Sequence, residues 1–186
     1  MSEANLVSVL GQLIDESTVD AVKRHWTYAQ LVHEPITKFD SLSKGWDRLS
    51  AEIFPNESSI GHRFKKLTGL CGAVAWSQSI EDLLYEVDGP IRNDLEIPPH
   101  DAQRDFDRVN KTLKSHRNNQ RTDRQLLESV GTLLWTIRSN SMHGRKTPSG
   151  PTGPTNRDEQ ICDLGARVMV DLYSFAFPGW QSTLNL

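Results

Sequence analysis

The sequence lacks the patterns that would place it in several large classes of protein. Its 186 residues contain no run of about 18 apolar residues, so no segment is predicted to cross a membrane as a helix. The two cysteines, Cys71 and Cys162, form no Cys-x-x-Cys pair, which argues against a disulfide scaffold or a thiolate zinc site. The N-terminal residues lack the basic flank and the apolar block of a signal peptide, so we expect a cytoplasmic protein.

The motifs of several common enzyme chemistries are missing as well. The chain contains no P-loop, no Gly-x-Gly-x-x-Gly and no Gly-x-Ser-x-Gly sequence. Neither His-Glu-x-x-His nor His-x-His occurs, so the sequence predicts no metal ion and no cofactor. Five of the six histidines stand in no ligand pattern and are interpreted as surface or capping residues: His25, His33, His62, His100 and His116.

Apolar residues recur at helical spacing along nearly the whole chain. The two-residue alternation of a half-buried strand is absent over any useful length. The spacing predicts helices at about 18–33, 38–54, 59–87, 101–117, 123–143 and 157–177. Pro35 is predicted to end the first run, and Gly69 and Gly72 to interrupt the third. We therefore expect one all-α domain over 1–186, an antiparallel bundle of about four to six helices.

Charge is distributed unevenly along a chain whose net charge is −3. Residues 101–167 hold 12 Lys and Arg against 8 Asp and Glu, whereas the remainder holds 9 against 16. A basic region can favour a polyanion such as RNA, but solvated helix faces produce the same count. The charge pattern leaves both interpretations open.

One polar stretch ends the otherwise apolar helix predicted over 123–143. Arg138 can hold a phosphate with two donors, and His143 can move a proton near neutral pH. Asn140, between them, can orient a neighbour or contact a ligand. Further cations flank the Pro- and Gly-rich loop that follows: Arg145, Lys146 and Arg157. Together these residues could handle a phosphate without a metal.

A structural interpretation of the same residues stands beside this one. Helix C-termini attract cations because the helix macrodipole favours positive charge there, by roughly 0.3–1 kcal/mol each. On an unbroken helix, positions 138 and 143 also lie about 140° apart around the axis. They would converge only through a frayed last turn, or across an interface with a second copy of the chain.

The stretch Arg138-Ser-Asn-Ser-Met-His143-Gly144 resembles the Arg-x4–6-His signature of HEPN domains. The context is also similar, because a hydrophobic helix precedes the motif and a loop follows it. A helix beginning Arg157-Asp158 comes after that loop, so the resemblance covers about 122–177. HEPN domains are small all-α bundles, commonly dimeric, and many are metal-independent endoribonucleases of toxin, antiphage and RNA-processing systems.

The resemblance implies a composite site in which two copies of Arg138 and His143 meet at a homodimer interface. His143 would transfer protons, Arg138 would stabilise charge on the phosphorane, and Asn140 would belong to the same catalytic set. An RNA 2′-hydroxyl would attack the adjacent phosphorus and leave a 2′,3′-cyclic phosphate. RNA binding would fall to Ser139 and the three cations of the loop: Arg145, Lys146 and Arg157. An antitoxin or a sensor protein would be a further partner.

The sequence departs from the HEPN pattern at two positions. Active members often carry Asn, Asp or His directly after the arginine, where this chain has Ser139 and then Asn140. Members silenced by AMPylation carry a tyrosine two places after the histidine, where this chain has Arg145. The alternative function is a catalytically silent HEPN module that serves as a dimerisation or nucleotide- or RNA-binding scaffold.

Overall fold

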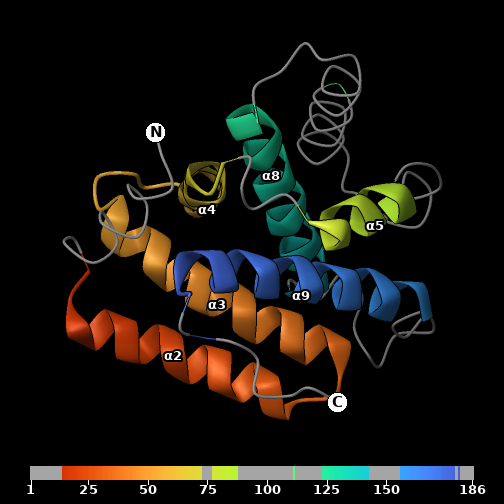
Figure 1. Ribbon diagram of the computed structural model, residues 1–186, viewed down its shortest axis with the longest axis horizontal. Helices are drawn as coiled ribbons and strands as arrows, with labels where there is room; N and C mark the ends of the chain where they lie inside the picture. The colour runs from red at the N-terminus through yellow and green to blue at the C-terminus, as the bar shows by residue number, and fades with distance from the viewer. Residues whose placement is uncertain are drawn as a thin grey trace.

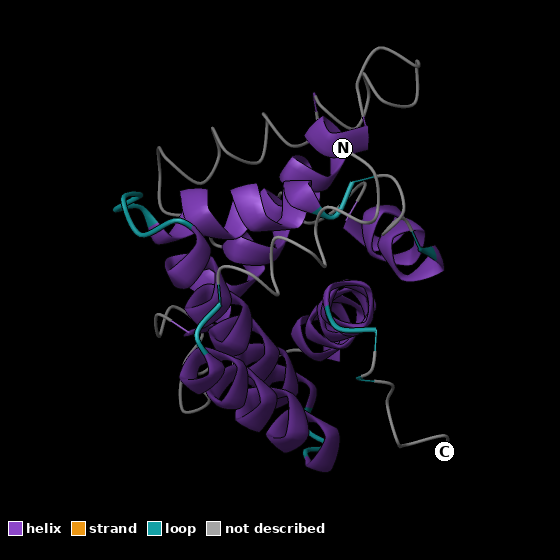
Figure 2. Ribbon diagram, turned by 60° about the vertical axis from the view of Figure 1, so that its left-hand side comes forward, coloured by secondary structure: helices purple, strands orange, loops and turns teal. Residues whose placement is uncertain are grey.

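The computed structural model describes residues 14–72, 77–87, 111, 123–142, 156–178 and 180. This part of the chain forms six α-helices and contains no strand (Figures 1 and 2). The predicted all-α fold is therefore confirmed. None of the described helices combines the length and the apolar character that crossing a bilayer demands.

The first two described helices form an antiparallel pair, α2 (Glu16–Leu31) and α3 (Pro35–Ile53). The Thr18 hydroxyl at the start of α2 lies 3.4 Å from the Glu52 carboxylate near the end of α3. Pro35 does not merely follow α2, as predicted; it is the first residue of α3. Proline suits this position because its fixed φ is helical and a first-turn N–H would lack a partner inside the helix.

The predicted third helix is two helices, α4 (Ile60–Leu70) and α5 (Gln78–Val87). Ser59 caps α4 by accepting a hydrogen bond from the His62 N–H at 3.3 Å. The prediction of a break at Gly69 is wrong, because Gly69 lies inside α4 against the Glu128 side chain. The break comes at Gly72, whose φ of 63° ends the helix.

The remaining two helices, α8 (Asp123–Met142) and α9 (Asn156–Ala176), agree with the sequence prediction to within a residue at each end. α4 and α8 run antiparallel, with Lys65 near Glu128 and Gly61 against Trp135. α9 packs on α3 and α5, and Figure 1 shows α8 running across the direction of α2, α3 and α9. The predicted helix at 101–117 lies outside the described residues, apart from Lys111.

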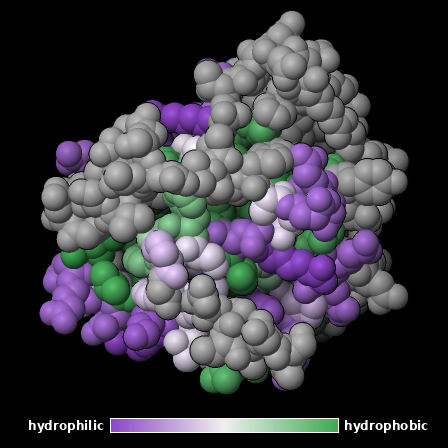
Figure 3. All heavy atoms as spheres, in the orientation of Figure 1, coloured by the Kyte–Doolittle hydropathy of each residue, from purple (hydrophilic) through white to green (hydrophobic). Residues whose placement is uncertain are grey.

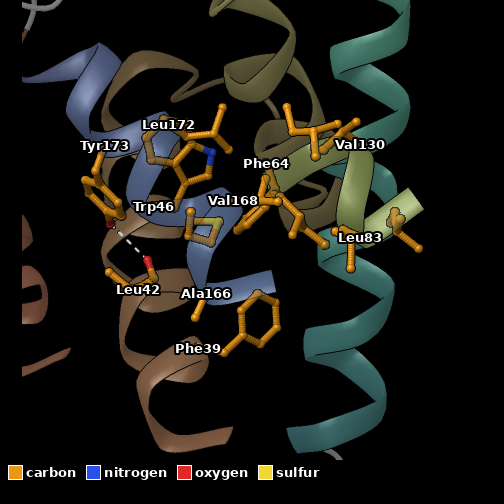
Figure 4. Packing of buried hydrophobic residues seen from close by; sticks show 14 of the residues in the cluster. Phe39, Leu42, Trp46, Phe64, Leu83, Val130, Ala166, Val168, Leu172 and Tyr173 are labelled. Carbon is orange, nitrogen blue, oxygen red and sulfur yellow. Dashed lines mark hydrogen bonds between the residues drawn. The ribbon is translucent and has the colours of Figure 1, made fainter. Parts of the chain in front are cut away.

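Trp46 of α3 lies at the centre of the core (Figure 4). Its indole N–H donates to the Thr68 hydroxyl at 3.2 Å, which links α3 to α4. Its ring meets the Tyr173 ring edge-on with centroids 5.1 Å apart, and the Tyr173 hydroxyl donates to the Leu42 carbonyl at 2.9 Å. These contacts hold α3 between α4 and α9.

Polar side chains lie at the surface beside this core. Figure 3 shows hydrophilic residues gathered at the lower left, where α2 begins. Both cysteines are buried, and burial raises the pKa of the Cys71 thiol far above its usual value. Some charged side chains are nevertheless largely buried, with exposed fractions between 13% and 22%: Asp40, Asp47, Arg63 and Arg138.

Candidate functional site

The apolar stripe of α8 sets the orientation of this helix against the core, and that orientation places Arg138. Val130, Leu134 and Ile137 are buried, so one face of α8 is pressed against the core. Arg138 directly follows Ile137, and its side chain is only 15% exposed. α8 then continues for four more residues and ends at Met142, one residue before His143.

Asp47 and Trp135 lie against the Arg138 guanidinium. Its Nη1 lies 3.6 Å from Oδ2 of Asp47, on α3. Its Cζ lies 5.1 Å from the centroid of the Trp135 ring, one turn earlier on α8, at cation–π distance. Trp135 itself packs against Phe64 of α4 with ring centroids 6.0 Å apart. Arg138 therefore lies where α3, α4 and α8 meet.

A second arginine shares the Asp47 carboxylate. Nη2 of Arg63, on α4, lies 3.4 Å from Oδ1 of Asp47. Nη1 of Arg63 also donates to the Glu57 carbonyl at 2.9 Å. We call these three side chains, Asp47, Arg63 and Arg138, the Asp47 junction. The side chains of Asp47 and Arg63 are 22% and 16% exposed, so the junction is largely shielded from water.

Sequence reasoning missed Asp47 and Arg63. The one available signal was position, since Asp47 directly follows the core residue Trp46 and Arg63 directly precedes the core residue Phe64. Charged residues beside core residues on a helix often lie at the edge of the buried face. Nothing in the sequence, however, pairs either of them with Arg138.

Glu57 carries further charge beside the junction. Its carboxylate accepts a hydrogen bond from Lys66 Nζ at 2.7 Å and lies 3.8 Å from Nδ1 of His62. The hydrogen bond from Lys66, helped by one from the Ser59 N–H, lowers the pKa of Glu57. The start of α4 is thus held by a charged pair on its exposed side and by Arg63 on its inner side.

The structure reaches only some of the predicted site residues. Ser139 is partly exposed on α8, next to Arg138. Asn140 belongs to α8 and Arg157 to α9, but their side chains lie outside the described part of the chain. The remaining three predicted residues lie outside it entirely: His143, Arg145 and Lys146.

Two other features of the described residues bear on binding. No group of three or more His, Cys, Asp or Glu side chains there could hold a metal ion. A shallow hollow of about 470 Å³ lies on α2, which carries none of the predicted site residues. Its lining includes two exposed large side chains, Tyr28 and Leu31, beside four charged or polar residues: Asp20, Lys23, Arg24 and Thr27.

Comparison with known proteins identifies no relative: no family model, no curated protein and no solved structure matches the chain. The resemblance to HEPN domains therefore rests on residues 138–144 and their sequence context. A shielded guanidinium at a helix end is chemically suited to donate hydrogen bonds to a phosphate oxygen.

Proposed function

We propose that the chain is a metal-independent endoribonuclease of the toxin or antiphage-defence type, acting in the cytoplasm. The observation that carries this proposal is the setting of Arg138. It is held by Asp47 and Trp135 in the last two turns of α8, and that helix ends one residue before His143. A fixed cation beside a histidine is what transesterification of RNA needs from a protein without a metal.

The proposed reaction is attack of a 2′-hydroxyl oxygen on the neighbouring phosphorus. The P–O5′ bond breaks, which leaves a 2′,3′-cyclic phosphate on one fragment and a 5′-hydroxyl on the other. His143 transfers protons between the attacking and leaving oxygens, and Arg138 stabilises the negative charge of the phosphorane. Asn140 orients the reacting groups, and the RNA backbone is bound by Ser139, Arg145, Lys146 and Arg157.

We propose further that the active species is a homodimer with a composite site. A two-fold axis brings identical helix ends together, so the ends of two α8 helices can supply Arg138 and His143 to one cleft. This arrangement also removes the need for both residues to face the same side of one helix. An antitoxin or a sensor protein would then regulate the dimer.

A silent HEPN scaffold is the second candidate, and one observation favours it. The ion pair with Asp47 and the 15% exposure of Arg138 are also the features of an arginine that joins helices. Such a module would bind RNA or a nucleotide, or would dimerise, without cleaving. Cleavage assays separate the two functions.

The test is incubation of total RNA with the protein in EDTA, followed by analysis of the fragment ends. Wild type should leave cyclic phosphate and 5′-hydroxyl ends. His143→Ala should lower the cleavage rate by about 100-fold or more, because a general acid–base group contributes roughly 10²–10⁴-fold. Arg138→Gln should lower it by about 100-fold or more as well, because loss of a group that stabilises transition-state charge costs roughly 10²–10³-fold.

Matched substitutions outside the site serve as controls. His62→Ala removes an exposed histidine of α4, and Arg167→Gln removes an exposed arginine of α9. Both should cleave like wild type. The proposal is contradicted if EDTA abolishes cleavage, or if His143→Ala cleaves as fast as wild type. If wild type binds RNA without cleaving it, the result supports the silent scaffold.

A further inference from the structure

Asp47 places its carboxylate near both arginines of the junction. Oδ1 faces Arg63 of α4 at 3.4 Å and Oδ2 faces Arg138 of α8 at 3.6 Å. Both distances exceed the roughly 2.7–2.9 Å of a tight charge-assisted hydrogen bond. The exposed pair of Arg167 and Asp163, in contrast, is closed at 2.7 Å. Asp47 therefore attracts the Arg138 guanidinium by charge, just beyond hydrogen-bond distance, and accepts a long hydrogen bond from Arg63.

Arg138 is also held by the packing of α4 on α8. The guanidinium lies over the Trp135 ring, 5.1 Å from its centroid. Trp135 packs closely against α4, since a methyl group at Gly61 would lie 2.8 Å from the Trp135 indole nitrogen. The Arg138 side chain therefore contacts both an aromatic ring packed on α4 and the Asp47 carboxylate.

We infer that Asp47 is a positioning residue for Arg138, an inference that rests on the proposed ribonuclease function. A free arginine side chain has many rotamers, and ordering it in the transition state would raise the barrier. Asp47 orders the guanidinium before RNA binds. Arg63 offsets the charge of Asp47, because the three side chains together carry two positive charges and one negative charge.

A positioning residue and a purely structural salt bridge predict different effects of Asp47→Asn on RNA affinity and on cleavage. The variant removes negative charge beside the RNA, so affinity for RNA should stay the same or rise. It also releases Arg138 from its position, so cleavage should slow by about 10–100-fold, the scale expected for a misplaced catalytic group. Loss of a purely structural salt bridge would instead lower the RNA affinity, the cleavage rate and the stability of the fold together.

The experiment measures both quantities on the full-length protein. Cleavage rate is followed on total RNA at saturating concentration in EDTA, and binding by fluorescence anisotropy on a mixed-sequence 2′-O-methyl oligonucleotide, which has no nucleophile. Asp47→Asn should lose cleavage while it keeps binding, and Asp47→Glu should recover part of the rate. Asp163→Asn, which removes the exposed carboxylate of α9, is the matched control and should change neither.

The possible results distinguish a failure of the positioning role from a failure of the ribonuclease proposal. If wild type cleaves and Asp47→Asn cleaves equally fast, or loses binding as much as cleavage, the positioning role is wrong and the ribonuclease proposal stands. If wild type does not cleave, both are wrong. Should Asp47→Asn fail to fold, the double variant Asp47→Asn/Arg63→Gln removes one charge of each sign. It should bind like wild type and still cleave slowly; a wild-type rate would overturn the inference.

Discussion

At the residue scale, Glu34 shows how one side chain sets a helix boundary. Its carboxylate accepts hydrogen bonds from the Ile36 N–H at 3.0 Å and the Thr37 N–H at 2.6 Å. Partial burial acts to raise the pKa of Glu34, but the hydrogen bonds from Thr37 and Ile36 outweigh it and lower the pKa below the ordinary 4.5. Glu34 therefore stabilises α3 in its charged form.

We expect Glu34→Ala to lower the free energy of unfolding by about 0.5–2 kcal/mol at pH 7, the usual cost of losing a helix cap. A carboxylate with a depressed folded pKa contributes fully above its ordinary pKa, and the contribution fades as pH falls through the folded value. The difference between variant and wild type should therefore shrink toward pH 3. Urea unfolding at both pH values measures it, and a difference that grows on acidification contradicts this account.

The residue scale is also where sequence reasoning reached its limit. The sequence predicts Arg138 as a site residue because it stands five residues before His143 in a short motif. Asp47 and Arg63 were missed because their connection to Arg138 exists only in the folded chain, where α3, α4 and α8 meet. A local pattern identifies a reacting group, whereas the groups that orient it are set by tertiary packing.

At the scale of the elements, helix periodicity predicted most of the described fold. α8 and α9 have long apolar stripes, and their bounds agree closely with the prediction. The errors fell at Pro35 and Gly69, where one residue type serves two structural purposes. Proline can follow a helix or begin one, and glycine can break a helix or let two helices approach. The packing partner decides between these roles.

Gly131 shows the second role of glycine, at the contact of α8 with α4. An added methyl group there would lie 2.8 Å from Cβ of Thr68 and 3.0 Å from the backbone Cα of Lys65. Thr68 also accepts the hydrogen bond from Trp46, so the fit at this point bears on the centre of the core.

We expect Gly131→Ala to lower the free energy of unfolding, because overpacking costs about 1–3 kcal/mol. Alanine gains roughly 1 kcal/mol over glycine inside a helix. The net loss should be about 1–2 kcal/mol, because the contact with the Lys65 backbone places the cost of overpacking toward its upper end. Gly72→Ala is the comparison variant. An added methyl group there meets no atom within 4 Å, so its loss of stability would come from the strain of alanine at a φ of 63°. Chemical denaturation measures both, and a Gly131→Ala protein as stable as wild type would contradict the described packing.

At the scale of the whole molecule, the all-α architecture followed from the sequence, whereas the arrangement of the helices did not. Periodicity gives each helix one apolar face but does not say which neighbour covers it. The pairing of α4 with α8, which holds Trp135 and Arg138, depends on small residues at Gly61 and Gly131. The single domain and the dimer remain predictions, and the composite site depends on the dimer.

Complementation between two inactive variants tests the composite site at the homodimer interface most directly. Arg138→Gln and His143→Ala are expressed together and assayed on RNA in EDTA, beside each variant alone. If the site is composite, random pairing makes about half of the dimers mixed, each with one intact Arg138 and one intact His143. Co-expression should then restore a substantial part of the wild-type cleavage rate. Cleavage no faster than that of either variant alone, in preparations shown to contain mixed dimers, would contradict a composite site.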